Sequence, residues 1–151
     1  MKNQNYTTSF LVNQTPKEAF DAINQVRSWW TENLVGATEK AGDEFEVRFG
    51  DVHYSKQRLI EVIDNQKVVW LVTDSKLSFV DDKQEWNDTR IVFDVIKEGA
   101  KTRVRFTHIG LNPGVECHEA CSNAWSGYIN LSLKSLIEIG EGKGELKDQD
   151  E

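Results

Sequence analysis

Residues 101–139 read KTRVRFTHIGLNPGVECHEACSNAWSGYINLSLKSLIEI, and within them the spacing of apolar residues changes from alternate positions to a helical period. Val104, Phe106 and His108 share one face of the predicted strand 101–109, because side chains alternate between the faces of a strand. After the turn at 112–114, the helical period runs from about Glu116 to Ile139. Roughly 22 residues make a helix about 33 Å long, which can cross a whole sheet. One side of this helix carries Cys117, Cys121, Trp125, Tyr128, Ser132 and Leu136.

Upstream of this stretch, the pattern predicts a succession of β-strands. Alternating or β-branched runs, separated by short polar connections, are typical of strands. KEGAK, residues 97–101, has the length and the glycine of a hairpin loop. Hairpin-length connections imply an antiparallel sheet. The expected strands are 6–12, 45–49, 59–63, 67–73, 90–96 and 101–109.

Two short helices are predicted between the first strand and the rest of the sheet. In TPKE, Thr15 is suited to cap a helix, Pro16 to its first position, and Glu18 to complete a capping box. Ala19, Phe20 and Ile23 then give the helix an apolar side. RSWW, residues 27–30, follows as a second short helix or a turn.

The order of these elements predicts an α+β domain: a strand, two short helices, a β-meander and a long C-terminal helix. The apolar side of the long helix has to be covered by the sheet. A twisted antiparallel sheet can curl around such a helix. We expect residues 1–140 to form this single domain and residues 141–151, which are charged and lack apolar periodicity, to form a flexible acidic tail.

Composition excludes several classes of function. The net charge of −7 argues against nucleic acid as a partner, since phosphate contacts need a basic face. The basic row Lys101, Arg103 and Arg105 fits a solvated strand face. No apolar run is long enough for a membrane helix, and the first residues lack an apolar signal core, so we expect a cytoplasmic protein. No nucleotide-loop or HExxH motif is present, and no cofactor is expected.

Five segments, taken in order, carry a family resemblance: TTSFLVNQTPKEAFDAI, SWW, KVVWLV, TRVRFTHIGL and CSNAWSGYINLSLKSLI. Together they resemble the START-like superfamily, also called SRPBCC, from about Tyr6 to Gly140. Within it they resemble the group named for the C-terminal domain of the activator of heat shock protein 90 ATPase. The resemblance implies a helix-grip fold, in which a curved antiparallel sheet wraps the long C-terminal helix and leaves a cavity between them. Relatives include binders of lipids, hormones and other small apolar molecules, cyclases and co-chaperones.

The residues expected to line that cavity face inward on the predicted strands and helix. His108 is either a polar handle for a ligand or a core histidine satisfied by a neighbour. The tryptophans either line the cavity or simply fill the core. Residues 75–86 form a polar loop that can be a cavity lid or a short edge strand, with Leu77, Phe79 and Trp86 as its apolar residues. The expected ligand-binding residues are Trp70, Phe93, Phe106, His108, Cys121, Trp125 and Tyr128.

Cys117 and Cys121 lie four residues apart and so share a helix face. With His108 and His118 they could be imagined as a zinc site, but only the two cysteines clearly converge, and a structural site needs four ligands. A nucleophilic thiolate would need a base, for which His108 is the candidate. Two small buried thiols are the favoured reading, and no metal is expected.

These observations favour a protein that binds a small apolar molecule and is not an enzyme. One alternative is a cyclase or hydrolase that uses His108 as general acid or base, which requires a second titratable group nearby. The acidic residues offer no convincing pair: Asp81 and Asp82 fall in the loop, and Asp94 faces away from the core. Another alternative is a module that interacts with a chaperone, which requires an exposed patch.

Overall fold

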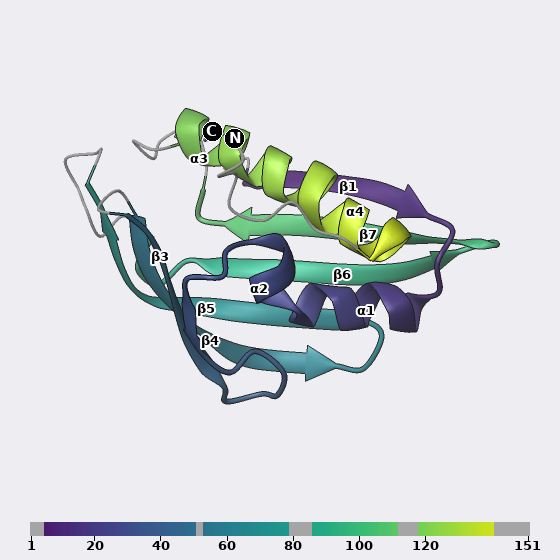
Figure 1. Cartoon of the computed structure of the whole chain (residues 1–151), viewed down its shortest axis with the longest axis horizontal. Coiled ribbons are helices and arrows are strands. Elements are labelled where there is room, and N and C mark those ends of the chain that lie inside the picture. Colours follow the sequence, from purple (N-terminus) through teal and green to yellow (C-terminus); the bar gives the residue numbers. More distant parts are fainter. Residues whose placement is uncertain (1–4, 51–52, 79–85, 112–117, 141–151) are drawn as a thin grey trace.

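The computed structural model describes residues 5–50, 53–78, 86–111 and 118–140. Its elements are, in order, β1 (Tyr6–Val12), α1 (Pro16–Asn24), α2 (Val26–Trp29), β2 (Leu34–Gly36), β3 (Glu44–Phe49), β4 (His53–Ile63), β5 (Lys67–Leu77), β6 (Arg90–Glu98), β7 (Lys101–Ile109), α3 (His118–Gly127), η1 (Tyr128–Leu133) and α4 (Lys134–Ile139). Figure 1 shows the helices together on one face of the sheet. The predicted α+β helix-grip arrangement is confirmed.

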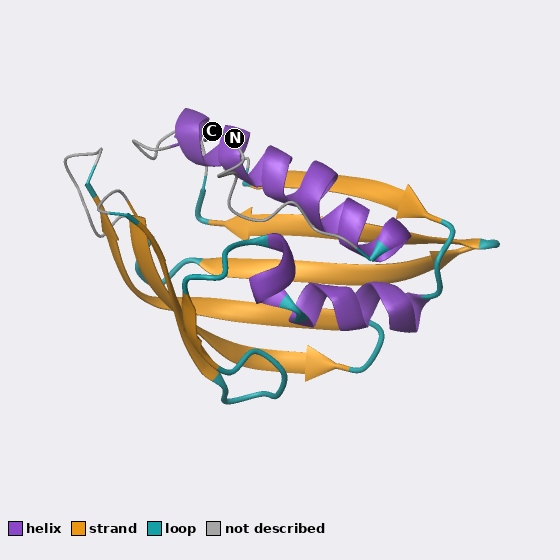
Figure 2. Ribbon diagram, in the orientation of Figure 1, coloured by secondary structure: helices purple, strands orange, loops and turns teal. Residues whose placement is uncertain are grey.

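Within the described residues, seven strands form one antiparallel sheet in the order β1-β7-β6-β5-β4-β3-β2. The first strand pairs with the last, with Phe10 opposite Val104. The pairing of β4 with β5 shifts register between Lys56 and Gln57 and again between Leu59 and Glu61. Such irregularities bend a strand and increase its twist. The strands bend at this side of the sheet, toward the face that carries the helices (Figure 2).

The start of α1 follows the predicted capping chemistry. The backbone N–H of Glu18 donates to Thr15 Oγ1 across 3.1 Å, and the backbone N–H of Thr15 donates to Glu18 Oε1 across 2.9 Å. Two donors that the first helical turn cannot pair internally are therefore satisfied. The helix then packs Ala19, Phe20 and Ile23 into the core.

The C-terminal helix runs over the β1–β7 edge of the sheet and is not α-helical throughout (Figure 1). A π-helical segment, η1, separates α3 from α4. The buried residues of this segment are Ile129, Ser132 and Leu133. The Ser132 hydroxyl donates to the Trp29 carbonyl across 2.6 Å and so ties η1 to α2. The helix ends at Gly140, whose φ of 79° and N–H bond to the Leu136 carbonyl form a left-handed C-cap.

Several boundaries differ from the sequence prediction. Strand β4 begins at His53, although the prediction began at residue 59. Strand β5 runs to Leu77, so residues 75–77 of the predicted loop are strand. Strand β2 was not predicted. Gly36 ends it at φ 122°, with its backbone so close to β3 that a Cβ would clash with the Glu44 carbonyl. The predicted helix start at Glu116 and the tail 141–151 lie outside the described residues.

The core occupies the space between sheet and helices and is rich in aromatic rings. Trp29, Trp70 and Phe93 meet at its centre, with ring centroids 4.9–6.3 Å apart. Four tryptophans are among its largest fully or almost fully buried side chains: Trp29, Trp30, Trp70 and Trp125. In the part of the chain that the structure describes, no helix is both long and apolar enough to span a membrane.

Candidate functional site

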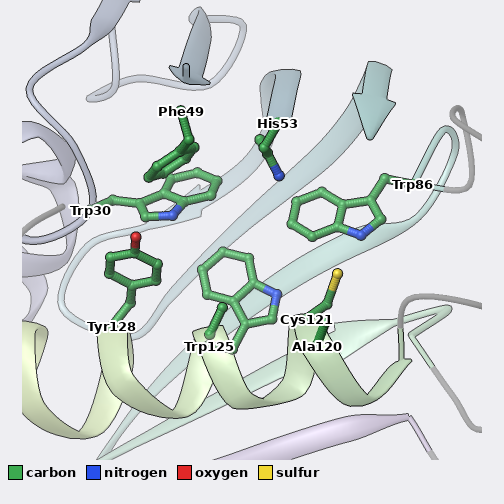
Figure 3. Close-up of a pocket in the computed structure, with 9 residues that line it drawn as sticks. Trp30, Phe49, His53, Trp86, Ala120, Cys121, Trp125 and Tyr128 are labelled. Atoms are coloured by element: carbon green, nitrogen blue, oxygen red, sulfur yellow. The ribbon is translucent and has the colours of Figure 1, made fainter. Parts of the chain in front are cut away.

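A half-open cavity of about 230 Å³ lies between α3 and the end of the sheet formed by β3 and β4. Figure 3 shows its lining side chains directed toward a common space from several elements. Trp30 follows α2, Phe49 ends β3, His53 begins β4, and Trp86 precedes β6. The complete described lining is Trp30, Phe49, His53, Trp86, Ala120, Cys121, Ala124, Trp125 and Tyr128.

The C-terminal helix supplies one wall through positions three and four residues apart. Cys121, Trp125 and Tyr128 repeat along one side of the helix, as this spacing requires. Ala120 and Ala124 stand beside them and remain solvent-exposed. Their methyl groups leave the space that larger side chains would fill, so the alanines keep the cavity open.

The aromatic rings of the lining contact one another. Trp125 lies 4.9 Å from Trp30 and 5.8 Å from Trp86, measured between ring centroids. His53 lies 4.7 Å from Trp86 and 5.2 Å from Phe49 and is nearly perpendicular to both. Rings of more than one orientation therefore border the same space.

His53 is the polar side chain that β4 contributes to the cavity. Alternation along the strand places His53, Ser55 and Gln57 on the same inner face. His53 Nε2 lies 2.9 Å from Ser55 Oγ, which accepts a hydrogen bond from Gln57 Nε2 at 2.6 Å. Burial lowers the pKa of His53 to about 4, so the imidazole is uncharged at pH 7.

His108 lies behind the cavity wall and uses both of its ring nitrogens. The indole N–H of Trp125 donates to Nδ1 across 3.1 Å. Indole can only donate, so Nδ1 accepts and the neutral ring carries its proton on Nε2. Nε2 then donates to Thr89 Oγ1 across 2.9 Å, and the Thr89 hydroxyl donates to the Trp86 carbonyl across 2.6 Å. Burial, followed by the nearby His53, lowers the pKa of His108 to about 3.

This directed chain of hydrogen bonds connects two walls of the cavity. It begins at the side chain of Trp125 on α3 and ends at the backbone of Trp86 before β6. His108 thus holds both tryptophans in place. It has no nitrogen left to exchange a proton with a substrate, and this arrangement does not favour its use as a general acid or base.

The structure brings together part of the predicted site. Cys121, Trp125 and Tyr128 line the cavity, and Trp86, predicted as a lid residue, forms one of its walls. Trp70, Phe93, Phe106 and Leu77 are almost completely buried in the core and are not among the described lining residues. Phe79 and Cys117 lie outside the described residues.

Sequence reasoning missed five of the lining residues: Trp30, Phe49, His53, Ala120 and Ala124. The two alanines could have been predicted from the sequence, because each directly precedes a predicted lining residue on the helix. His53 carried a weaker signal, since the inner face of β4 begins with His53, Ser55 and Gln57, which are all polar. Hydropathy alternation therefore revealed only the later part of that strand.

The comparisons with known proteins agree with this fold. A model of the family described as activator of Hsp90 ATPase homolog 1-like protein matches residues 15–138. No curated protein matches the chain. Among solved structures, the chain is similar to the Aha1 dimer of Colwellia psychrerythraea, with a TM-score of 0.73 and 24% identity over 92% of this chain and 99% of the other.

Two further structures share the fold at lower identity. The protein SSP2350 of Staphylococcus saprophyticus gives a TM-score of 0.68 and 16% identity, covering 92% of this chain and 95% of the other. DynU16, a putative protein from the dynemicin biosynthetic locus, gives a TM-score of 0.64 and 14% identity, covering 94% of this chain and 51% of the other. Since the family model spans most of the sequence, the chain belongs to the activator of Hsp90 ATPase homolog 1-like family.

Proposed function

We propose that this protein binds a small apolar molecule in the cavity between the sheet and the C-terminal helix. The cavity with its aromatic lining is the observation that carries the proposal. Apolar walls with a few polar groups are characteristic of small-molecule sites. At about 230 Å³ the cavity is smaller than the range of about 300–1,000 Å³ usual for such sites, which favours a compact ligand.

The polar groups of the lining belong mostly to aromatic side chains. The His53 imidazole is uncharged at pH 7 and can orient a ligand by hydrogen bonding, whereas the Trp125 indole N–H is already donated to His108. His108 contributes indirectly, because its hydrogen bonds hold Trp125 and the backbone of Trp86. The ligand therefore meets a wall that is already in position.

A filling substitution tests the proposal. In Ala124→Phe the new ring occupies the cavity, whereas in Asn123→Phe the same ring is added at an exposed neighbouring position. A panel of compact, largely apolar compounds, both neutral and cationic, should raise the Tm of the wild type and of Asn123→Phe but not that of Ala124→Phe. An equal response of all three proteins, or no response from any, would contradict the proposal.

A second candidate function is interaction with a chaperone, as the family description suggests. The observation in its favour is an exposed groove on η1 and α4. Leu131 and Ile139, 66% and 67% exposed, border it together with Lys134 and Glu138. Addition of the protein should raise the ATPase rate of an Hsp90-type chaperone. The substitution Leu131→Ser should reduce this stimulation, whereas Ala124→Phe should leave it unchanged. No stimulation by the wild type would remove this candidate.

A further inference from the structure

The cavity is surrounded by aromatic rings, and this lining restricts the chemistry of the ligand. Trp30, Trp86 and Trp125 come from three separate parts of the chain, and Phe49 and Tyr128 extend the ring of aromatic groups. Phe49 lies 5.8 Å from Trp30 and 5.9 Å from Tyr128, measured between ring centroids. The faces of aromatic rings carry negative electrostatic potential, which attracts a cation within about 6 Å of the ring centre.

The orientation of the rings argues against a slot for a flat molecule. A planar ligand inserted between two parallel indoles needs their planes about 7 Å apart, twice the usual contact distance. Trp86 and Trp125 are 14° from parallel, but their centroids are only 5.8 Å apart, so no ring fits between them. His53 stands at 81° to Trp86 and at 73° to Trp30. Walls at steep angles suit a rounded group better than a flat one.

The charges in and around the site also restrict the class of ligand. None of the described lining residues is Lys, Arg, Asp or Glu, so an anionic ligand would lose its hydration without gaining a charged partner. Burial lowers the pKa of His53 to about 4, and the imidazole therefore does not repel a cation at pH 7. The net charge of −7 makes the approach of a cation more favourable than that of an anion.

We infer that the ligand is a compact organic cation, an alkylated ammonium whose methyl groups contact the rings of Trp30, Trp86, Trp125, Phe49 and Tyr128. This inference rests on the proposed function and specifies the class of its ligand. An alkylated ammonium offers apolar surface to the walls and positive charge to the ring faces. When the nitrogen is fully alkylated, the cation also loses less hydration than a primary ammonium, because no N–H remains to be satisfied.

Calorimetric titration with a matched pair of probes tests the inference. Choline carries a trimethylammonium group, and neohexyl alcohol has the same shape with carbon in place of the charged nitrogen. The wild type should bind choline about tenfold more tightly than the alcohol, at constant ionic strength. Ala124→Phe should abolish binding of choline, and Asn123→Phe should preserve it.

A ring-removing variant makes the test specific to the aromatic faces. Phe49→Leu keeps an apolar side chain in the wall but removes one ring, so choline should bind about threefold more weakly while the alcohol is affected less. If the alcohol binds the wild type as tightly as choline, and Ala124→Phe abolishes this, the cation inference is overturned and the apolar-ligand function stands. If neither probe binds, the cation inference is also overturned, and the proposed function loses its support from compact ligands.

Discussion

The indole N–H of Trp125 donates to Nδ1 of His108 across 3.1 Å, in a region where both side chains are almost completely buried. This bond determines the tautomer of His108 and hence the direction of the bonds that follow through Thr89 to the Trp86 backbone. A strand residue, a helix residue and a loop residue are coupled in this way. Loss of the imidazole should therefore affect both stability and the shape of the cavity.

His108→Leu should lower the free energy of unfolding by about 1–3 kcal/mol, because the Trp125 N–H then remains buried without a partner. Urea unfolding measures the change, and His118→Leu, at a partly exposed position, provides the control. The double variant with Trp125→Phe should lose less than the sum of the two single losses. If the loss in the double variant equals the sum of the two single losses, the bond between His108 and Trp125 does not couple the two residues energetically.

Stability should decrease in mild acid. The pKa values of His53, which lines the cavity, and of the buried His108 are lowered on folding, to about 4 and about 3 respectively, from 6.5 in the unfolded chain. The unfolded state thus binds more protons below pH 6.5. Stabilisation by the neutral imidazoles is complete above that pH and is lost as the pH falls toward 3. Each unit of difference between the folded and unfolded pKa corresponds to about 1.4 kcal/mol. The stability lost through His108 between pH 6.5 and pH 3 is therefore on the order of several kcal/mol.

Urea unfolding between pH 7 and 4.5 checks this prediction. His108→Leu should reduce the slope of the free energy of unfolding against pH but leave the part that His53 contributes. An unchanged slope in that variant would show that His108 is not buried in its neutral form.

Thr15→Ala should remove the capping box of α1 and cost about 1 kcal/mol of stability. The substitution removes the bond from the Glu18 N–H to Thr15 Oγ1 and the bond from the Thr15 hydroxyl to Glu18 Oε1. Thermal unfolding measures the shift in Tm, with Ser28→Ala at an exposed position as control. Equal Tm values for both variants would contradict a role of the cap.

Gly36→Ala and Gly99→Ala form another matched pair. Both glycines have positive φ, but an added Cβ at Gly36 would clash with the β3 backbone at Glu44, whereas the space around Gly99 is open. We expect Gly36→Ala to cost more than about 2 kcal/mol and Gly99→Ala no more than about 1 kcal/mol. Similar losses in the two proteins would show that β2 does not approach β3 this closely.

The fold could be predicted from the sequence because its signals are local and repeated. Alternation in strands such as 101–109, the capping residues at Thr15 and the helical period after residue 116 each specify an element independently. Their order then leaves few ways to cover the long helix. Strand β2 escaped prediction because it has only three residues and no alternating pattern of its own.

The candidate site was less predictable, because it depends on contacts between distant segments. The inward direction of His108 was correctly predicted, but the sequence could not show that Trp125 lies between this histidine and the cavity. Trp70 and Phe93 face inward as expected and are buried beneath other aromatic side chains. Which inward-facing ring reaches the surface of a cavity depends on packing between layers, and strand periodicity does not report it.

The central claim, that a small molecule binds within the aromatic lining, is tested most directly by NMR of the five indole N–H groups during titration with choline. Trp30, Trp86 and Trp125 line the cavity, whereas Trp29 and Trp70 lie in the core and serve as internal controls. The account predicts saturable shifts of the three lining indoles and much smaller shifts of the other two. If neither saturating choline nor saturating neohexyl alcohol moves the three lining indoles, or if both shift all five indoles equally, no compact ligand occupies this cavity and the central claim is contradicted.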